Sequence, residues 1–182
     1  MPAAVSMVCD VVDRFEVSGR KIVVLTMPGD RRDEDILEVA KIAAGHFDHY
    51  ICRRDSNTRG REPGEVPGLL REGLLANGVS VDAIEIIEEE EDANQSALAM
   101  ARAGDLLLIL ADNVARSWKQ IIYFKPGEDV LADAPPATAI EIPQEFFGEF
   151  EFDEDMELIR AFYADKRGKR PAEASELRFR KT

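Results

Sequence analysis

Two arginines and an aspartate form a turn that has the chemistry of an anion-binding site. The turn is Gly29-Asp30-Arg31-Arg32, and it follows a run of aliphatic residues. At a helix N-terminus, unpaired backbone N–H groups and the helix dipole favour an anion, and arginine binds carboxylate or phosphate through two parallel hydrogen bonds. The alternative is a solvated capping turn, in which the arginines pair with the carboxylates of residues 33–35.

A second polar stretch carries four arginines and several hydrogen-bonding side chains. It spans residues 53–65 and also follows a short apolar run. Both stretches should therefore leave the carboxyl ends of strands and meet at one rim of a sheet, where open α/β sheets bind ligands. In this acidic chain they would form a concentrated positive spot; the alternative is an ordinary polar surface loop. The candidate binding residues of the two stretches are Gly29, Asp30, Arg31, Arg32, Asp55, Asn57, Arg59 and Arg61.

A third polar pair, Asp112-Asn113, follows the last apolar run of the series. By itself this pair is typical of a helix N-cap. The two histidines, His46 and His49, lack the spacing of a metal-ligand set or a catalytic triad, so we expect them to be structural. The sequence therefore predicts binding residues, but no catalytic residue and no metal ligand.

Four apolar runs are expected to form the strands that position these loops. They are Lys21–Met27, His49–Cys52, Val81–Ile87 and Asp105–Ala111. Each is followed by a helical pattern long enough for a right-handed crossover, which predicts parallel strands. The fold class is α/β: a Rossmann-like, doubly wound, mainly parallel sheet of four or more strands with helices on both faces. The first run should be central, and the last should also be covered on both faces, because neither alternates.

The alternation of strands and helices ends after residue 127. The chain is therefore divided into a domain of residues 1–127 and an extension of residues 128–182. The extension contains a loop, a segment at Thr138–Ile142 that could add an edge strand, a short helix and a basic tail expected to be mobile. Its clustered phenylalanines predict that Phe146–Phe162 docks onto the helical layer or onto a second copy of the chain.

Charge and composition exclude several classes of function. The 182 residues carry a net charge of −13, which argues against nucleic acid or an anionic membrane as the main partner. The two cysteines, Cys9 and Cys52, stand in apolar contexts without a CxxC motif and are expected to be reduced core residues. No signal peptide opens the sequence and no apolar run reaches membrane-spanning length, so we expect a cytoplasmic protein.

Three segments give the chain a resemblance to a known family. They read MPGDRRDED, RRDSNTRGREPGEV and AGDLLLILADNVARSWKQII. Together they resemble the carboxy-terminal domain of Mur-type ATP-dependent amide ligases, and among these most of all the cyanophycin synthetases. In that family a Gly-Asp-Arg turn follows the first strand of the domain, and a polar loop with Asp-Asn and Arg follows the second. The similarity extends from about Pro2 to Pro126.

The resemblance implies a substrate-binding role in amide-bond formation. Such a domain presents the incoming amino acid to an acyl phosphate and closes over ATP and Mg²⁺, which a separate central domain holds in the same or a neighbouring chain. In cyanophycin synthetase the polymer is aspartate with arginine on its side chains, so the implied substrate is an aspartate- or arginine-type amino acid or peptide. The arginine loops would bind its carboxylate, while Asp30, Asp33 and Asp112 would bind an amino or guanidinium group.

The sequence departs from complete ligases in two ways. It contains no GxxxxGK[ST] phosphate-binding loop, so we expect the isolated chain to bind no cofactor and to be inactive as a ligase. The family's Asp-Tyr-x-His-Asn-Pro segment is not present before Pro2, which fits an excised piece, a split ligase or a repurposed domain. The alternative function is a free-standing binding or regulatory module that forms a homodimer or docks on a partner through its C-terminal extension.

Overall fold

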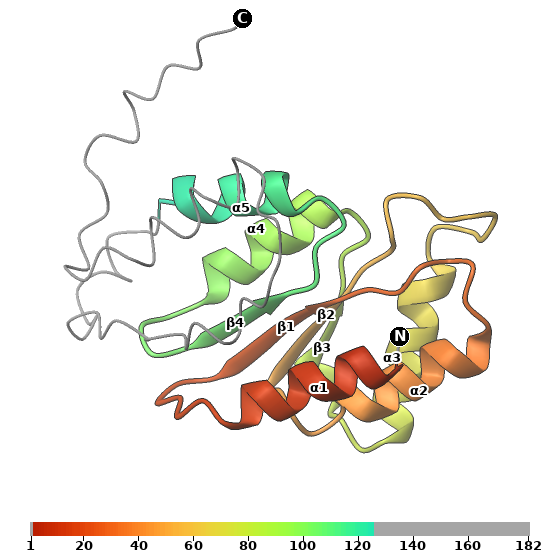
Figure 1. The fold of residues 1–182 in the computed structure, drawn as a ribbon, viewed down its shortest axis with the longest axis horizontal. Coiled ribbons are helices and arrows are strands. Elements are labelled where there is room, and N and C mark those ends of the chain that lie inside the picture. Colours follow the sequence, from red (N-terminus) through yellow and green to blue (C-terminus); the bar gives the residue numbers. More distant parts are fainter. Residues whose placement is uncertain (1, 126–182) are drawn as a thin grey trace, which may run out of the picture. The chain divides into compact units, whose positions relative to one another are not determined.

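The computed structural model describes residues 2–125, which form a four-stranded parallel sheet with helices on both faces (Figure 1). The predicted α/β fold class is therefore confirmed. The strands, in the order β3-β2-β1-β4, are β1 (Lys21–Leu25), β2 (His49–Cys52), β3 (Ile84–Ile86) and β4 (Leu106–Ile109). The helices are α1 (Pro2–Asp13), α2 (Asp33–Ala43), α3 (Glu65–Ala76), the 3₁₀ turn η1 (Val81–Ala83), α4 (Glu90–Met100) and α5 (Val114–Tyr123).

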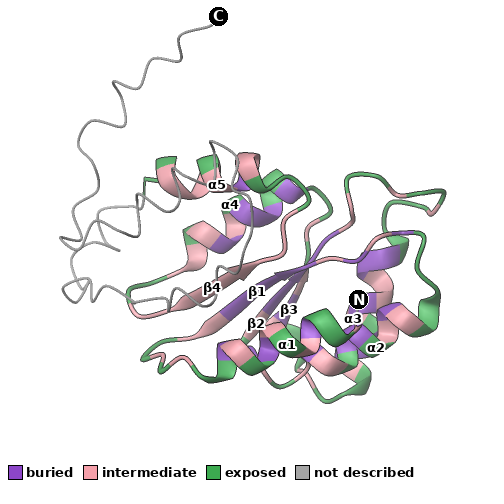
Figure 2. Cartoon of the chain, viewed as in Figure 1, coloured by how far each residue is buried: buried purple, intermediate pink, exposed green. Residues whose placement is uncertain are grey.

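Strand β1 is the centre of the sheet and pairs in parallel with β2 on one side and with β4 on the other. Val23 stands opposite Tyr50 of β2 and Leu108 of β4. The residues from Ile22 to Leu25 are at most 1% exposed (Figure 2). This burial is what an uninterrupted apolar run requires. The predicted central position of the first strand is confirmed.

Helices α1, α2 and α3 cover one face of the sheet, and α4 and α5 cover the other (Figure 1). Because side chains alternate along a strand, β1 contributes to two cores. Val23 belongs to the larger core, together with residues of α1, α2 and α3. Val24 belongs to the smaller one and packs with Ala93 and Ala97 of α4. Two layers of helices therefore hold the strand ends in fixed positions.

The sheet reverses its direction of growth between β1 and β4. Helices α2 and α3 lead the chain outward from β1 to β2 and β3 over one face, and α4 returns it over the other face to β4. Such a reversal opens a crevice at the carboxyl ends of the two strands, and ligands of open α/β sheets bind there. The loops that leave β1, β2 and β4 border this crevice.

The prediction that Asp105–Ala111 is covered on both faces is confirmed only in part: Leu106 and Leu108 pack against the larger core and Leu107 and Ile109 against the smaller one, but none of them is fully buried. Strand β4 is parallel, but it is an edge strand of the described sheet and all four of its residues are half-buried (Figure 2). The outer edge has no neighbouring strand within residues 2–125, and a groove beside α1 leaves part of one face uncovered. An aliphatic composition alone therefore overestimates the burial of this strand.

The predicted strand Val81–Ile87 is also too long. Its first three residues form η1, in which the amide of Ala83 donates to the carbonyl oxygen of Ser80 at 3.0 Å. The chain leaves α3 through Asn77 and Gly78 at the surface, and Val81 is 52% exposed. A solvated turn therefore precedes the short strand β3.

The proposed extension of residues 128–182 lies outside the described residues. Its edge strand, its helix, its docking phenylalanines and the homodimer that depends on them therefore stay predictions. Within residues 2–125, no helix is long and apolar enough to cross a membrane. Cys9 and Cys52 are buried free thiols, as predicted.

Candidate functional site

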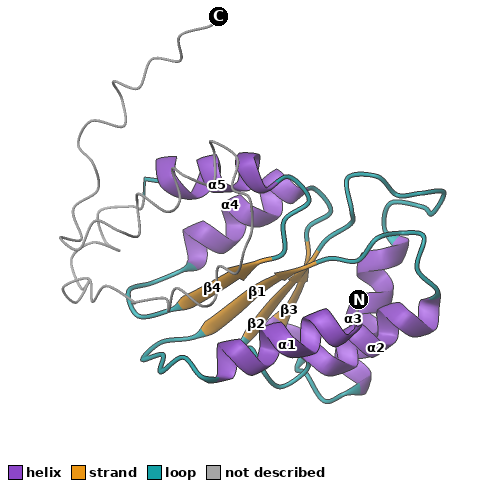
Figure 3. Cartoon of the chain, viewed as in Figure 1, coloured by secondary structure: helices purple, strands orange, loops and turns teal. Residues whose placement is uncertain are grey.

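The loops that leave β1 and β2 meet at the carboxyl ends of the strands, as predicted (Figure 3). Arg61 holds them together. Its Nε donates to the carbonyl oxygen of Gly29 at 2.7 Å, and its Nη2 donates to that of Arg31 at 2.6 Å. The same guanidinium group pairs with Asp33 at 2.6 Å and with Glu65. Arg61 therefore fixes the shape of the rim, and its donors are occupied by the protein itself.

Two side chains of the second loop determine its backbone conformation. Asp55 Oδ1 accepts a hydrogen bond from the amide of Asn57 at 2.8 Å, and Asn57 Oδ1 accepts one from the amide of Arg59 at 3.0 Å. These turns hold Arg59 at a φ of 52°, a left-handed conformation that non-glycine residues seldom adopt. Asp55 and Asn57 thus shape the loop that presents the Arg59 side chain at the rim.

Asp30 lies between two guanidinium groups. Its Oδ2 accepts a hydrogen bond from Arg59 Nη1 at 2.8 Å, and its Oδ1 lies 3.6 Å from Arg31 Nε. The hydrogen bond from Arg59 lowers the pKa of Asp30, so this carboxylate stays ionised. The three side chains are between 40% and 46% exposed, which leaves them accessible to a ligand. Two cations against one carboxylate leave a net positive charge that suits an anionic group.

Arg32 follows the alternative prediction of a capping turn. It occupies the N-cap position of α2, and its guanidinium group donates two hydrogen bonds to Asp35, at 3.0 and 2.9 Å. The side chain is 75% exposed and is paired within its own helix. Arg32 therefore supports the start of α2, and its guanidinium group pairs with Asp35 rather than with Asp30.

The most deeply buried charge at the rim is Arg53, which follows β2 and is fully buried. Its Nη1 donates to Asp112 Oδ2 at 2.9 Å, and its Nη2 donates to the carbonyl oxygen of Leu110 at 2.6 Å. Asp112 also accepts the amide of Ser56 at 2.9 Å. Burial raises the pKa of Asp112, but the hydrogen bonds from Arg53 and Ser56 outweigh it and hold the pKa below its usual value. Asp112 therefore ties the β2–α3 loop to the β4–α5 loop.

Glu90, at the start of α4, is a buried carboxylate that was not predicted from the sequence. It is 4% exposed and accepts hydrogen bonds from Ser117 Oγ at 2.7 Å, from Arg116 Nη2 at 2.9 Å and from the amide of Asp112 at 3.2 Å. Burial raises the pKa of Glu90, but the hydrogen bonds from Ser117 and Arg116 and the nearby charge of Arg53 outweigh it and lower the pKa. Glu90 stands in a run of five acidic residues, so residue type alone gives no signal that separates it from its solvated neighbours.

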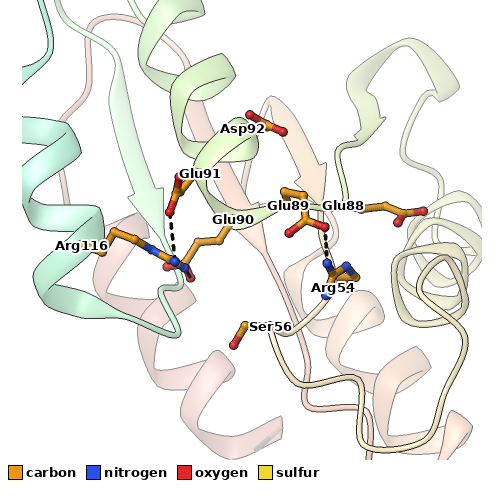
Figure 4. A pocket seen from close by; sticks show the side chains of 8 residues that line it. All are labelled: Arg54, Ser56, Glu88, Glu89, Glu90, Glu91, Asp92 and Arg116. Carbon is orange, nitrogen blue, oxygen red and sulfur yellow. Dashed lines mark hydrogen bonds and ion pairs between the residues drawn. The ribbon is translucent and has the colours of Figure 1, made fainter.

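A polar pocket of about 290 Å³ lies beside this buried network (Figure 4). Arg54 pairs with Glu89, and Arg116 pairs with Glu91 at 3.0 Å. Carboxylates outnumber guanidinium groups in the lining, so the pocket favours a cation. The lining residues are Arg54, Ser56, Glu88, Glu89, Glu90, Glu91, Asp92 and Arg116. We call this set the acidic pocket.

The rim is therefore not the concentrated positive spot that the sequence suggested. Arg54 and Arg61, whose side chains are at most 20% exposed, pair with carboxylates of adjacent segments. The chain brings these opposite charges into contact when the loops come together, and the pairing cancels much of the positive charge. Two oppositely charged regions remain at the rim. Arg31 and Arg59 form the positive region, and the acidic pocket forms the negative one.

The other predicted polar residues have structural partners. Asn113 is the N-cap of α5, and its side chain accepts the amide of Arg116 at 3.0 Å. His46 Nδ1 lies 2.8 Å from Asp13, away from the rim, and His49 Nε2 lies 3.3 Å from Glu85. Among residues 2–125, no group of three or more histidine, cysteine, aspartate or glutamate side chains is arranged to hold a metal ion.

A doubly wound parallel sheet with charged loops at the carboxyl ends of its strands defines a Rossmann-like α/β domain. Residues 1–113 match the family model described as "Mur ligase, glutamate ligase domain". The chain belongs to this family. The resemblance inferred from the three sequence segments is confirmed.

The chain is similar to several cyanophycin synthetases. The chain is 38% identical over 126 residues to cyanophycin synthetase of Trichormus variabilis, covering 68% of this chain and 14% of that protein. It is 42% identical over 105 residues to the one from Nostoc sp., covering 57% of this chain and 11% of that protein. The chain thus spans about one seventh of the length of these relatives or less.

A solved ligase structure shares the fold. It is a UDP-N-acetylmuramoyl-L-alanyl-D-glutamate–2,6-diaminopimelate ligase, with a TM-score of 0.51 and 22% identity. The alignment covers 60% of this chain and 21% of the ligase. This similarity supports the α/β architecture of the domain.

Proposed function

We propose that this domain binds the incoming amino acid of an ATP-dependent amide ligase of the cyanophycin synthetase and Mur kind. In this role the chain supplies the substrate-binding surface. A separate central domain, in the same or a neighbouring chain, supplies ATP, Mg²⁺ and the activated acyl phosphate. The observation that carries the proposal is the presence of two oppositely charged regions at the carboxyl ends of the strands.

An amino acid has the complementary charges. Its carboxylate suits Arg31 and Arg59, which both face Asp30 and are accessible. Its ammonium or guanidinium group suits the acidic pocket, in which Glu88 and Asp92 form no ion pair with any residue of the described part. The similarity to cyanophycin synthetases favours an aspartate- or arginine-type amino acid or peptide as the ligand.

Calorimetric titration of the full chain with arginine, aspartate and β-aspartyl-arginine tests this function. We expect at least one of the three to bind, and Arg59→Ala to weaken that binding about tenfold through loss of a charge-assisted hydrogen bond. Arg59→Ala should change the free energy of unfolding by less than about 0.5 kcal/mol, because the side chain is exposed. The matched control is Arg14→Ala, an exposed arginine just after α1.

Two results would contradict the proposed binding site. One is the absence of binding by all three ligands. The other is an equal loss of affinity in Arg59→Ala and Arg14→Ala, which would indicate general electrostatic attraction rather than a site. A parallel pair, Glu88→Gln in the acidic pocket and Glu72→Gln on the exposed face of α3, makes the same comparison for the cationic end of the ligand.

The proposal also limits what the isolated chain can catalyse. Mixed with ATP, Mg²⁺ and amino acids, it should release neither ADP nor phosphate, because the sequence has no phosphate-binding loop. Phosphate release can be followed with a coupled assay. Turnover that disappears in both Asp30→Ala and Arg31→Ala would show that the chain itself catalyses the reaction and would contradict this limit.

A further inference from the structure

The chain leaves α3 through an asparagine–glycine pair at the surface. Asn77-Gly78 is the only such pair in the sequence, and both residues are exposed. Asparagine is chemically labile, most of all before glycine, because no side chain obstructs the approach of the glycine nitrogen to the asparagine side-chain amide. A Cβ atom added to Gly78 would meet no atom within 4 Å. The fold therefore leaves room for the five-membered ring that this approach would close.

The last turn of α3 holds both of the groups that would react. Asn77 Nδ2, the leaving group, donates to the carbonyl oxygen of Gly73 at 2.7 Å. The main-chain amide of Gly78, the nucleophile, donates to the carbonyl oxygen of Leu75 at 3.1 Å. Gly78 has a φ of 86°, the left-handed conformation that ends many helices. The closed turn thus restrains the reaction, and ring closure requires these two hydrogen bonds to break.

We propose that Asn77 is a modification site, at which spontaneous deamidation proceeds through opening of the last turn of α3 and then weakens that turn. The main-chain nitrogen of Gly78 loses its proton and forms a bond to Cγ of Asn77. The Cγ–Nδ2 bond breaks, and ammonia leaves with that proton. Water then opens the resulting succinimide ring. Hydrolysis at Cγ gives aspartate, and hydrolysis at the main-chain carbonyl carbon gives isoaspartate.

The modification changes both the hydrogen bonding and the charge at the end of α3. The amide nitrogen that donates to Gly73 is lost, and an ionised carboxylate, which only accepts hydrogen bonds, takes its place. The new negative charge lies at the C-terminal end of a helix, where the dipole disfavours an anion. In isoaspartate the main chain also runs through Cβ and is one carbon longer. The modified turn should therefore open more readily than the original one.

The site is separate from the candidate ligand-binding rim. Helix α3 begins at Glu65, which pairs with Arg61 of the rim. Its 12 residues span about 18 Å, and Asn77 follows its other end. Deamidation of Asn77 is therefore independent of the proposed ligase function.

Peptide mass spectrometry of the full chain measures the reaction, after incubation at one mildly alkaline pH with and without guanidinium chloride. Asn77 should deamidate in both states, but about 30-fold more slowly in the native protein, the factor expected for two hydrogen bonds worth about fivefold each. Electron-transfer fragmentation separates aspartate from isoaspartate. Asn113 is the internal control: it is exposed, but the β-branched side chain of Val114 crowds the following nitrogen, so its deamidation should be far slower in both states.

Hydrogen exchange measures the opening of the turn independently. The amides of Gly78 and Val79 donate to the carbonyl oxygens of Leu75 and Leu74, at 3.1 Å each. The protection of these amides reports how rarely the turn opens. If the opened turn is the reacting state, the slowing of native deamidation and the protection factor of Gly78 should agree within about threefold.

Three variants test the chemistry and its consequence. Asn77→Gln could close only a six-membered ring, which forms more slowly, so position 77 should stay unmodified over the same period. Asn77→Asp has the charge of the product, whereas Asn77→Ala loses the hydrogen bond to Gly73 without adding a charge. Asn77→Asp should therefore have the lower urea midpoint of these two variants.

Four results would overturn the proposal. Native deamidation at the unfolded rate would show that the turn does not restrain Asn77. Slowing far beyond the protection of Gly78 would show that a wider opening of the fold is needed. Absence of deamidation in the unfolded chain would show that the pair is unreactive. Equal urea midpoints of Asn77→Asp and Asn77→Ala would show that the charge of the product does not weaken the turn.

Discussion

Gly29 and the carbonyl oxygen of Thr58 are in such close contact that a Cβ atom on Gly29 would lie 2.0 Å from that oxygen. Gly29 belongs to the turn after β1, and Thr58 belongs to the loop after β2. The glycine is therefore required because another backbone occupies the position of its missing side chain. The two loops pack main chain against main chain, which fixes their relative position.

Gly29→Ala should lower the free energy of unfolding by about 1–3 kcal/mol, the usual cost of overpacking a closed contact. The matched control is Gly68→Ala in α3, where an added Cβ meets no atom within 4 Å. That helical substitution should stabilise the protein by about 0.5–1 kcal/mol. Urea unfolding measures both. Equal effects of the two substitutions would show that the contact with Thr58 does not constrain the loops.

Arg53→Met should destabilise the protein by about 3–5 kcal/mol, because it leaves the carboxylate of Asp112 without its buried cation. The control is Arg32→Ala, which removes an exposed ion pair with Asp35 and should change stability by less than about 1 kcal/mol. In chemical denaturation, Arg53→Met combined with Asp112→Asn should recover part of the loss. A double variant less stable than the sum of the single changes would contradict the pairing.

Acid should destabilise the protein through Asp105, whose side chain is 4% exposed. Burial raises the pKa of Asp105, but hydrogen bonds from Arg20 and Arg102 outweigh it and lower the pKa. With a lowered folded-state pKa, the stabilisation is complete above the unfolded value of about 3.9 and is lost as the pH falls through the folded value. Urea midpoints between about pH 7 and pH 3 should therefore fall at the acidic end.

A matched pair of variants tests whether Asp105 causes this acid dependence. Asp105→Asn should lower the midpoint at neutral pH and reduce its fall towards acid. Asp82→Asn, on the exposed turn η1, should leave the whole curve unchanged. If Asp105→Asn retains the full acid dependence of the original protein, other carboxylates are responsible for it.

Cys52 should resist alkylation while the protein is folded. The residue is fully buried, and burial raises the pKa of its thiol to about 12. The thiolate is the reactive form, so iodoacetamide should modify Cys52 at mildly alkaline pH only after unfolding. Mass spectrometry of the alkylated peptides, with and without urea, measures this. The alkylation of Cys9 on α1, which is 2% exposed, provides an internal comparison. Modification of native Cys52 at the rate of a free thiol would show that the core opens.

The position of the two loops at the carboxyl ends of β1 and β2 could be predicted, because the sequence shows clearly where each strand ends. The apolar run of β1 stops at Pro28 and Gly29, and that of β2 stops at Arg53, so both loops could be placed at the carboxyl ends of parallel strands. Their meeting then follows from neighbouring strands in a parallel sheet. Contact between the two loops therefore needed no information from tertiary structure.

The partners of the charged side chains could not be predicted in the same way. Arg53 and Arg54 are adjacent and identical in type, yet one is fully buried against Asp112 and the other pairs with Glu89 at the surface. These pairs join residues 59 and 35 positions apart, respectively. Local periodicity contains no information about such distant contacts. For the same reason the sequence did not separate Glu90 from its acidic neighbours.

Arg61 binds the turn after β1 partly through the main-chain oxygens of Gly29 and Arg31. A main-chain oxygen is present whatever side chain the residue carries, so replacement of Arg31 leaves both of these bonds available. Position 31 can thus be randomised in a protein library while the loops stay docked, whereas randomising position 61 would remove the bonds that Arg61 makes between them. Attempts to redirect ligand preference by directed evolution should begin at Arg31 and keep Arg61 constant.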